Sequence, residues 1–254
     1  MLFRSHLEIR HPKSFPNVSL LPRILNRPIK ALKRRGKMIE ISWSGDYVLL
    51  THLKMTGQLL FKDRQQLAGG GHPSKNCTQL PNSHTRVIYT LDNQSQLFFN
   101  DMRLFGWQKI LQRDQEQVML QALGPDADDS KITPEYLQKA FAKTARAIKQ
   151  VIMDNRIMVG IGNIYAAEIL FVAGISPLLP AKQLSLSQIK KMLKCQRDIL
   201  SRAIALRGTT FDGRYVDARG LGGNYESQLQ VYGRCQRPCK REVEIGRASC
   251  RERV

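Results

Sequence analysis

The chain has 254 residues, enough to bury a sizeable core and to form two domains. It contains 40 Lys and Arg against 21 Asp and Glu, a formal net charge of +19, while 42% of its residues are hydrophobic. This balance excludes a disordered tail and predicts a folded protein with a polyanionic partner, but charge alone does not separate DNA from ribosomal RNA or an anionic membrane. No apolar run could span a bilayer, no signal-peptide core precedes the first strands, and five cysteines fit a reducing compartment, so we expect a cytoplasmic protein.

Both ends of the sequence differ in character from the rest. Residues 1–5 and 244–254 read like translations of short sequencing adapters, and such segments are excluded from reasoning about the fold. We therefore expect residues 6–243 to be a native fragment that lacks both of its natural ends.

The first half of the chain is rich in short alternating segments typical of strands. Residues 31–37 read as a basic turn that leads into a strand at 38–43, and a second strand is expected at 47–53. Further strands are expected at 58–61, 86–91 and 96–99. A glycine-rich polar stretch, 68–83, separates the first of these from the others. Several short strands without intervening helices predict an antiparallel β-sandwich or flattened barrel over residues 6–113.

The pattern then becomes helical. Thr133, followed by a proline, reads as a cap that begins a helix running to about Arg146. Ser185 with Gln188 three residues later resembles a capping box, and it precedes apolar residues that recur on one helical face. The sequence therefore predicts a helical domain over residues 126–228.

A glycine turn stands inside this helical region. Gly160 and Gly162 allow backbone conformations closed to other residues, and Asn163 stands where its side chain can cap the following helix. Amides at such a helix start point outward with the positive end of the dipole and can bind phosphate. Residues 164–172 are apolar almost all round, with Glu168 as the only charge, which indicates a buried helix. On spacing alone, an ordinary helical hairpin explains the turn equally well.

Four ordered motifs cover nearly the whole chain. They are HLKMTGQL (52–59), NDMRLFGW (100–107), VGIGNIYAAEILFVAGISP (159–177), and LRGTTF (206–211) with QVYGR (230–234). Together they resemble formamidopyrimidine-DNA glycosylases, repair enzymes that remove oxidised purines. The resemblance implies an α+β multidomain protein: an N-terminal antiparallel β-sandwich, a helix-two-turn-helix domain, and a truncated zinc-finger remnant at residues 229–243.

The resemblance also implies roles for individual residues. Lys37 matches a lysine that contacts phosphate beside the lesion and assists elimination. Met55, Arg103 and Phe105 match the trio that fills the void left by an everted nucleotide, although their residue types alone suggest core, loop and core. Further matches to DNA contacts are His52, His84, Lys143, Lys149, Gly162 and Asn163. Matches to the loop that closes over the extruded base are Thr209, Thr210 and Tyr225. Without the resemblance, Lys37 and the histidines read as ordinary surface and strand residues.

Some positions depart from the family pattern. Leu104 and Thr144 stand where relatives often carry a basic residue, which removes a phosphate contact at each. Family members end in a zinc finger built from two cysteine pairs, and a four-thiolate site needs both pairs. Here Cys239 matches the first ligand, Glu242 stands in place of the second, and Cys235 is the only nearby substitute. We expect zinc in the complete protein and none in this chain.

The resemblance implies a base-excision repair glycosylase with lyase activity, acting as a monomer on double-stranded DNA with oxidised bases or abasic sites. The family's nucleophile is the amine of an N-terminal proline followed by glutamate. In this sequence both residues are absent from the start, and an internal proline nitrogen is an amide that cannot attack the sugar. Lys37 could substitute only with a lowered pKa, for which a basic turn gives no evident reason. We expect the chain as written to be inactive.

Two alternatives stay open. One is an endonuclease VIII-like glycosylase for oxidised pyrimidines. The purine enzyme is favoured over it by Met55, Arg103, Phe105 and the Thr209–Thr210 loop. The other is a non-catalytic DNA-binding protein that uses the same glycine turn. An encoded Met-Pro-Glu start in the complete gene would indicate the enzyme.

Overall fold

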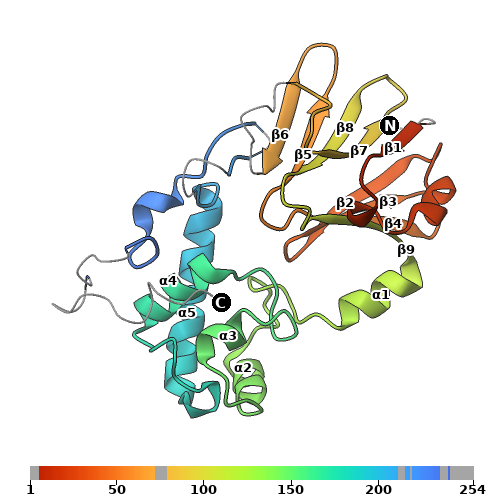
Figure 1. Cartoon of the computed structure of the whole chain (residues 1–254). Coiled ribbons are helices and arrows are strands. Elements are labelled where there is room, and N and C mark those ends of the chain that lie inside the picture. Colours follow the sequence, from red (N-terminus) through yellow and green to blue (C-terminus); the bar gives the residue numbers. More distant parts are fainter. Residues whose placement is uncertain (1–5, 72–78, 211–214, 218, 235–239, 241–254) are drawn as a thin grey trace. The chain divides into compact units, whose positions relative to one another are not determined.

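The structure is a computed structural model that describes residues 6–71, 79–210, 215–217, 219–234 and 240 (Figure 1). The described residues form two compact units. The first combines Met1–Leu120 with Thr209–Asn224, and the second combines Gln121–Gly208 with Tyr225–Val254. The short segment that follows the last long helix therefore belongs with the strands, although it is distant from them in sequence.

Two antiparallel sheets make up the first unit, as far as the structure describes it. One sheet has the order β1-β7-β8-β5-β6 and the other has the order β2-β3-β4-β9. The strands of the first sheet are β1 (His6–Ile9), β5 (Gly57–Lys62), β6 (Leu67–Gly71), β7 (Thr85–Thr90) and β8 (Gln96–Asp101). Those of the second are β2 (Ile29–Arg35), β3 (Met38–Trp43), β4 (Tyr47–His52) and β9 (Trp107–Gln112). The predicted β-sandwich is confirmed.

The core of this unit lies between the two sheets. Alternate strand residues point to one face, so each sheet contributes every second side chain to the shared layer. The buried residues include Ile41, Trp43, Leu49 and Ile110 from one sheet and Val87, Tyr89 and Phe99 from the other. Phe15 and Ile24, from the segment containing the 3₁₀ helices η1 (Pro12–Ser14) and η2 (Val18–Arg23), complete the cluster.

Two segments predicted as turn or loop are strands. The basic run expected as a turn forms β2 as far as Arg35, which pairs with Met38, so only two residues make the turn. Ladder hydrogen bonds to β3 decide this outcome, because charged side chains on an edge strand can point into solvent. The start of the glycine-rich stretch forms β6, where a Cβ on Gly69 would collide with the side chain of Leu60. Glycine is needed there because the strands approach closely.

The second unit is helical, as predicted. Its helices are α2 (Pro134–Phe141), α3 (Ile148–Ile152), α4 (Asn163–Ala173) and α5 (Leu186–Ala205), with the 3₁₀ turns η3 (Ala181–Gln183) and η5 (Tyr225–Gln228). Thr133 Oγ1 accepts the N–H of Tyr136, and Ser185 and Gln188 form a full capping box. Both predicted helix starts are confirmed. Within the described ranges, no helix is long and apolar enough to cross a membrane.

Helix α2 is shorter than predicted. It ends at Phe141, five residues before the expected Arg146. The following residues exchange the helical ladder for bonds to a distant segment: the carbonyl of Arg146 accepts the N–H of Ala181, and Ile148 N–H donates to the carbonyl of Leu179. Tertiary pairing therefore overrides local helix propensity at this point.

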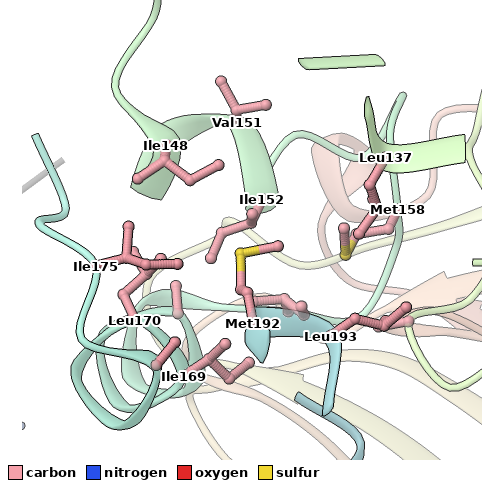
Figure 2. Close-up of a cluster of buried hydrophobic side chains, with 14 of the residues drawn as sticks. Leu137, Ile148, Val151, Ile152, Met158, Ile169, Leu170, Ile175, Met192 and Leu193 are labelled. Atoms are coloured by element: carbon pink, nitrogen blue, oxygen red, sulfur yellow. The ribbon is translucent and has the colours of Figure 1, made fainter. Parts of the chain in front are cut away.

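Side chains from the helices converge on one apolar core (Figure 2). Met192 and Leu193 of α5 lie with Ile152 of α3 and with Ile169 and Leu170 of α4, all nearly or wholly buried. Burial on most sides explains why α4 lacks a polar face.

The one charge on α4 also has a structural partner. Glu168 is buried, and its carboxylate accepts the backbone N–H groups of Gln230, Val231 and Tyr232 at 2.8–2.9 Å. Three donors satisfy a charge that burial would otherwise disfavour. The QVYGR motif is thereby attached to α4.

A second buried charge network lies where β9 meets helix α1 (Arg113–Gln121). The guanidinium of Arg113 donates to Glu40 at 2.8 Å, to Glu116 at 2.9 Å and to Ser42 at 2.7 Å. Burial acts to raise the pKa of Glu40, but hydrogen bonds from Arg113 and Ser42 outweigh it and lower that pKa. Burial raises the pKa of Glu116 despite its bond to the same guanidinium. A single guanidinium thus bonds two buried carboxyl groups.

We predict that Arg113→Met destabilises the protein by about 3–5 kcal/mol near pH 8, because it leaves two buried carboxylates without their cation. Without the guanidinium, the folded-state pKa values of both glutamates rise above their unfolded values. The folded variant then binds more protons than the unfolded chain, so its stability falls as pH rises. Urea unfolding at pH 5 and pH 8 should show the smaller loss at pH 5.

Arg64→Met is the matched control, because Arg64 is exposed in the same unit. It should change the free energy of unfolding by less than about 0.5 kcal/mol at either pH. An Arg113→Met loss of equal size at both pH values would contradict the assigned network.

Candidate functional site

Two loops of the first unit carry exposed apolar side chains. Met55, between β4 and β5, is 62% exposed, and Phe105, between β8 and β9, is 50% exposed. Arg103 lies with both: its guanidinium carbon is 4.7 Å from the Phe105 ring centroid, and Nη1 is 3.6 Å from Met55 Sδ. The structure therefore brings together the three residues predicted to act together. Neither apolar side chain belongs to the core.

Both loops hold a residue other than glycine in the left-handed region. Lys54, next to Met55, has φ 52°, and Leu104, between Arg103 and Phe105, has φ 59°. Such conformations cost energy and persist only where the surroundings impose them, which is common at functional sites. We call these two loops, residues 53–56 and 102–106, the tip.

Cations and aromatic rings adjoin the tip at the ends of β3, β4 and β9. The strand register places Met38 opposite His52 and His52 opposite Trp107, so Lys37 lies at the same edge. The His52 and Trp107 rings are 5.8 Å apart, and Lys109 Nζ lies 5.0 Å from the Trp107 ring centroid. Charges attached to a rigid sheet edge suit a polyanionic ligand.

His52 is neutral in this cluster. Its Nδ1 accepts the backbone N–H of Lys54 at 3.0 Å, so in the neutral ring the proton resides on Nε2. Partial burial, followed by the charges of Lys54 and Lys37, lowers the pKa of His52 to about 4. At neutral pH this side chain offers a hydrogen-bond donor and no charge.

The pKa of Lys37 is lowered, although the sequence analysis found no reason for this. Its side chain reaches solvent, but partial burial and then the charge of Lys54 lower the pKa of its ammonium group. This shift has no signal in the sequence, because the nearby end of β4 becomes apparent only in the fold. Lys54, Trp107 and Lys109 were likewise not identified as site residues, although the first two lie inside the matched motifs.

His84 lies just before β7. It is half-buried, its N–H donates to Asn82 Oδ1 at 2.9 Å, and its carbonyl accepts the N–H of Asp101 at 2.9 Å. Asp101 is the residue that ends β8 and precedes the second tip loop. His84 is therefore connected to the tip through the backbone.

The glycine turn of the second unit precedes α4. Gly160 has φ 111°, which an L side chain rarely adopts, and Gly162 is the extended N-cap residue. The expected cap by Asn163 is wrong: Asn163 is the first helical residue, is exposed, and no side chain caps the helix. The first turn contains no acidic residue, so its amides present the positive end of an 11-residue helix.

The two predicted lysine contacts of this unit have different environments. Lys143 is exposed just after α2, where a phosphate could reach it. Lys149, on α3, is only 1% exposed. A side chain buried to this extent cannot meet a phosphate in this conformation, so the contact predicted for Lys149 is not supported.

The residues of the predicted lesion loop are divided between the two units. Thr209 and Thr210 belong to the first unit, where Thr209 bridges to Asn224 and Thr210 Oγ1 bonds Tyr215 and Gly223. Val216 in the same segment forms two backbone hydrogen bonds with Gly71, at the end of β6.

Tyr225 belongs instead to the core of the helical unit. It is 3% exposed, and its ring lies 5.9 Å from that of Tyr165. Its role in the loop that closes over an extruded base stays a prediction. Its N–H donates to the carbonyl of Gly208, which anchors the point where the chain re-enters this unit.

The two cysteines considered as zinc ligands, Cys235 and Cys239, lie outside the described residues. In the part of the chain that is described, no group of three His, Cys, Asp or Glu side chains could hold a metal ion. The described side chains do not fit a tetrahedral zinc site, and no chemical step is assigned to zinc.

Comparisons with known proteins agree with this arrangement. The family model of the formamidopyrimidine-DNA glycosylase N-terminal domain matches residues 4–108, and that of the formamidopyrimidine-DNA glycosylase H2TH domain matches residues 123–214. The formamidopyrimidine-DNA glycosylase of Moorella thermoacetica is 36% identical over 242 residues, which are 93% of this chain and 83% of the relative. That of Carboxydothermus hydrogenoformans is 36% identical over 253 residues, 96% of this chain and 88% of the relative.

Solved structures show the same similarity. The MutM (Fpg) protein from Thermus thermophilus has a TM-score of 0.77 and 29% identity, over 97% of this chain and 84% of that one. The Lactococcus lactis Fpg in complex with an abasic site containing DNA has a TM-score of 0.77 and 25% identity, over 92% of this chain and 82% of that one. With a sequence relative at 36% identity across most of both chains, this protein belongs to the formamidopyrimidine-DNA glycosylase family.

Proposed function

We propose that this protein binds double-stranded DNA and removes oxidised purines in base-excision repair, with lyase activity at the resulting abasic site. The observation that carries the proposal is the tip, where Met55, Arg103 and Phe105 lie together at the surface. The crystallised Lactococcus lactis relative, bound to DNA with an abasic site, supports the assignment of DNA as the ligand.

The tip suits a duplex from which a base has been extruded. An enzyme that cuts a glycosidic bond must take its base out of the stack, at a cost of roughly a few kcal/mol. Apolar side chains inserted between base steps offset part of that cost, and a guanidinium can face the base left without a partner. Phe105 and Met55 provide the apolar side chains, and Arg103 provides the guanidinium.

The cationic sheet edge and the start of α4 provide two kinds of phosphate contact. Lys37 and Lys54 supply charge, while neutral His52 supplies a hydrogen bond through Nε2. Gly162 and Asn163 supply backbone amides, and Lys143 adds an exposed ammonium nearby in sequence. Such contacts determine affinity and orientation, and the tip determines preference for a lesion.

The chemistry proposed is covalent. In a chain that begins with proline, the secondary amine attacks the sugar carbon and loses its proton, and the bond to the oxidised base breaks with its electron pair leaving on the base. The sugar ring then opens at its C1′–O4′ bond, the oxygen takes up a proton, and an iminium forms. Loss of sugar protons then expels the flanking phosphates in turn. Forming a covalent intermediate divides one difficult displacement into easier steps.

Affinity for DNA should depend on salt concentration. Log affinity for DNA should fall linearly with log salt concentration, with a slope of roughly 0.9 per neutralised phosphate. Lys37→Met should reduce the magnitude of that slope by about 0.9, whereas His52→Gln should weaken binding without changing the slope, because His52 carries no charge at neutral pH. Fluorescence anisotropy across a salt series at pH 7 measures both.

Each variant should weaken binding to plain duplex and to lesion-containing duplex by the same factor, since both duplexes carry the phosphates. A change in slope for His52→Gln would mean that the ring is charged when bound. A loss confined to lesion-containing duplex would contradict the phosphate assignment of Lys37.

The second prediction concerns the tip. Arg103→Ala and Phe105→Ala should each reduce affinity for a duplex with a stable abasic analogue by roughly tenfold, with little change for plain duplex, where no void needs filling. Leu32→Ala is the control, because Leu32 is exposed and apolar in the same unit but lies on β2, outside the tip. Equal losses on both duplexes would contradict the insertion role.

The third prediction tests the covalent step by borohydride trapping with an oxidised-purine duplex. All prolines of the printed sequence are internal, so the polypeptide as printed should give no crosslinked band, and a version that begins with Pro-Glu should give one. A strong band from the printed polypeptide would place the nucleophile elsewhere, with Lys37 as the first residue to test. No band from either version would favour a non-catalytic DNA-binding protein.

A further inference from the structure

We infer that Asp101 is a positioning residue whose buried carboxylate locks the two tip loops into one preformed unit. The inference rests on the proposed function, in which the tip enters the duplex. It concerns a residue that touches no ligand and acts through the backbone of the loops that do.

The carboxylate is fully buried and accepts three hydrogen bonds. Oδ1 accepts the hydroxyl of Thr56 and, at 3.2 Å, the backbone N–H of Arg103, while Oδ2 accepts the backbone N–H of Gly106 at 2.6 Å. The Arg103 N–H is shared with Thr56 Oγ1 at 3.1 Å. The same carboxylate thus holds the residue after Met55 and two backbone amides that flank Phe105.

A carboxylate suits this geometry. Three donors converge on its two oxygens, and a carboxylate has acceptor capacity for all of them. Bonds to a charged acceptor are also about twice as strong as neutral ones. An asparagine at this position would direct its NH₂ group at one of the donors and lose that bond.

The position of Gly106 beside the carboxylate favours glycine. A Cβ there would lie 2.9 Å from Phe99 Cζ, 3.1 Å from Asp101 Oδ2 and 3.2 Å from the carbonyl oxygen of His52. These distances leave no room for a side chain between the carboxylate and the end of β4. The amide of Gly106 can therefore approach the carboxylate only because the residue is glycine.

The loops joined in this way are distant in sequence but leave paired strands. Thr56 precedes β5, Arg103 and Gly106 follow β8, and Gly57 of β5 lies opposite Asp101 of β8, so the ladder brings the two loops to the same end of the sheet. The carboxylate adds hydrogen bonds to loop residues that lie beyond the ladder. Met55, Arg103 and Phe105 are then ordered before binding, which reduces the entropy cost of inserting them.

Asp101 also relates His84 to the tip. Its N–H donates to the carbonyl of His84 at 2.9 Å, and its carbonyl accepts Nε–H of Arg86 at 2.7 Å. Asp101 thus holds both His84, a predicted phosphate contact, and the loops that carry the inserted residues.

The test is a double-mutant cycle on the full chain with Asp101→Asn and Phe105→Ala. We measure the ratio of affinities for a duplex with one tetrahydrofuran abasic analogue and for the same duplex without it. Asp101→Asn should lower that ratio by roughly tenfold. Adding Phe105→Ala should lower it by less than about twofold more, because the ring is no longer held in place.

Asp63→Asn is the matched control. Asp63 lies in the same unit and likewise accepts two backbone N–H groups, from Gln65 and Gln66, but in the exposed β5–β6 turn away from the tip loops in sequence. Its substitution should leave the affinity ratio unchanged. Should Asp101→Asn fail to fold, as judged by its thermal unfolding, the same cycle is run with Thr56→Val, which keeps the volume and removes the hydroxyl that donates to the carboxylate and accepts the Arg103 N–H.

Amide hydrogen exchange separates this inference from the function on which it rests. In Asp101→Asn the amides of Arg103 and Gly106 should exchange roughly tenfold faster, while those of Gln65 and Gln66 do not change. Faster exchange without any effect of Phe105→Ala on lesion preference would leave the lock in place and refute the insertion role. Unchanged exchange, or full additivity in the cycle, would overturn the role of Asp101.

Discussion

The antiparallel register across β3, β4 and β9 is the constraint on which the candidate site depends. By pairing Met38 with His52 and His52 with Trp107, it brings three distant segments to one edge of a sheet. The loops that leave that edge carry the tip. The sheet is rigid because its inner face packs against the second sheet, so hydrophobic burial in the sandwich core holds the residues at this edge in place.

This edge holds several positive charges close together, which would repel one another without a ligand. Partial burial, and then the charges of Lys54 and Lys37, disfavour protonation of His52, and a neutral ring limits the repulsion. Partial burial, and then the charge of Lys54, lower the pKa of Lys37. A polyanion that neutralises the lysines removes this penalty, so the unfavourable electrostatics of the free protein contribute to the affinity of the bound one.

The sequence was most informative where structure is local. Thr133, Ser185 and Gln188 act within one helical turn, and their caps were predicted correctly. Properties that depend on residues distant in sequence were not predicted. The exposure of Met55 depends on a loop held by an aspartate 45 residues away, and the burial of Lys149 depends on the packing of its unit. The two errors of element type, at residues 31–35 and 67–71, arose because strand pairing outweighed composition.

The hydrogen bonds that Glu168 accepts from Gln230, Val231 and Tyr232 couple the stability of two segments that are distant in sequence. The three amides have this acceptor only where α4 is formed and presents its carboxylate to them. Detaching the QVYGR segment would leave a buried carboxylate without its donors, which is costly. Local unfolding of α4 therefore removes the support of the QVYGR segment as well.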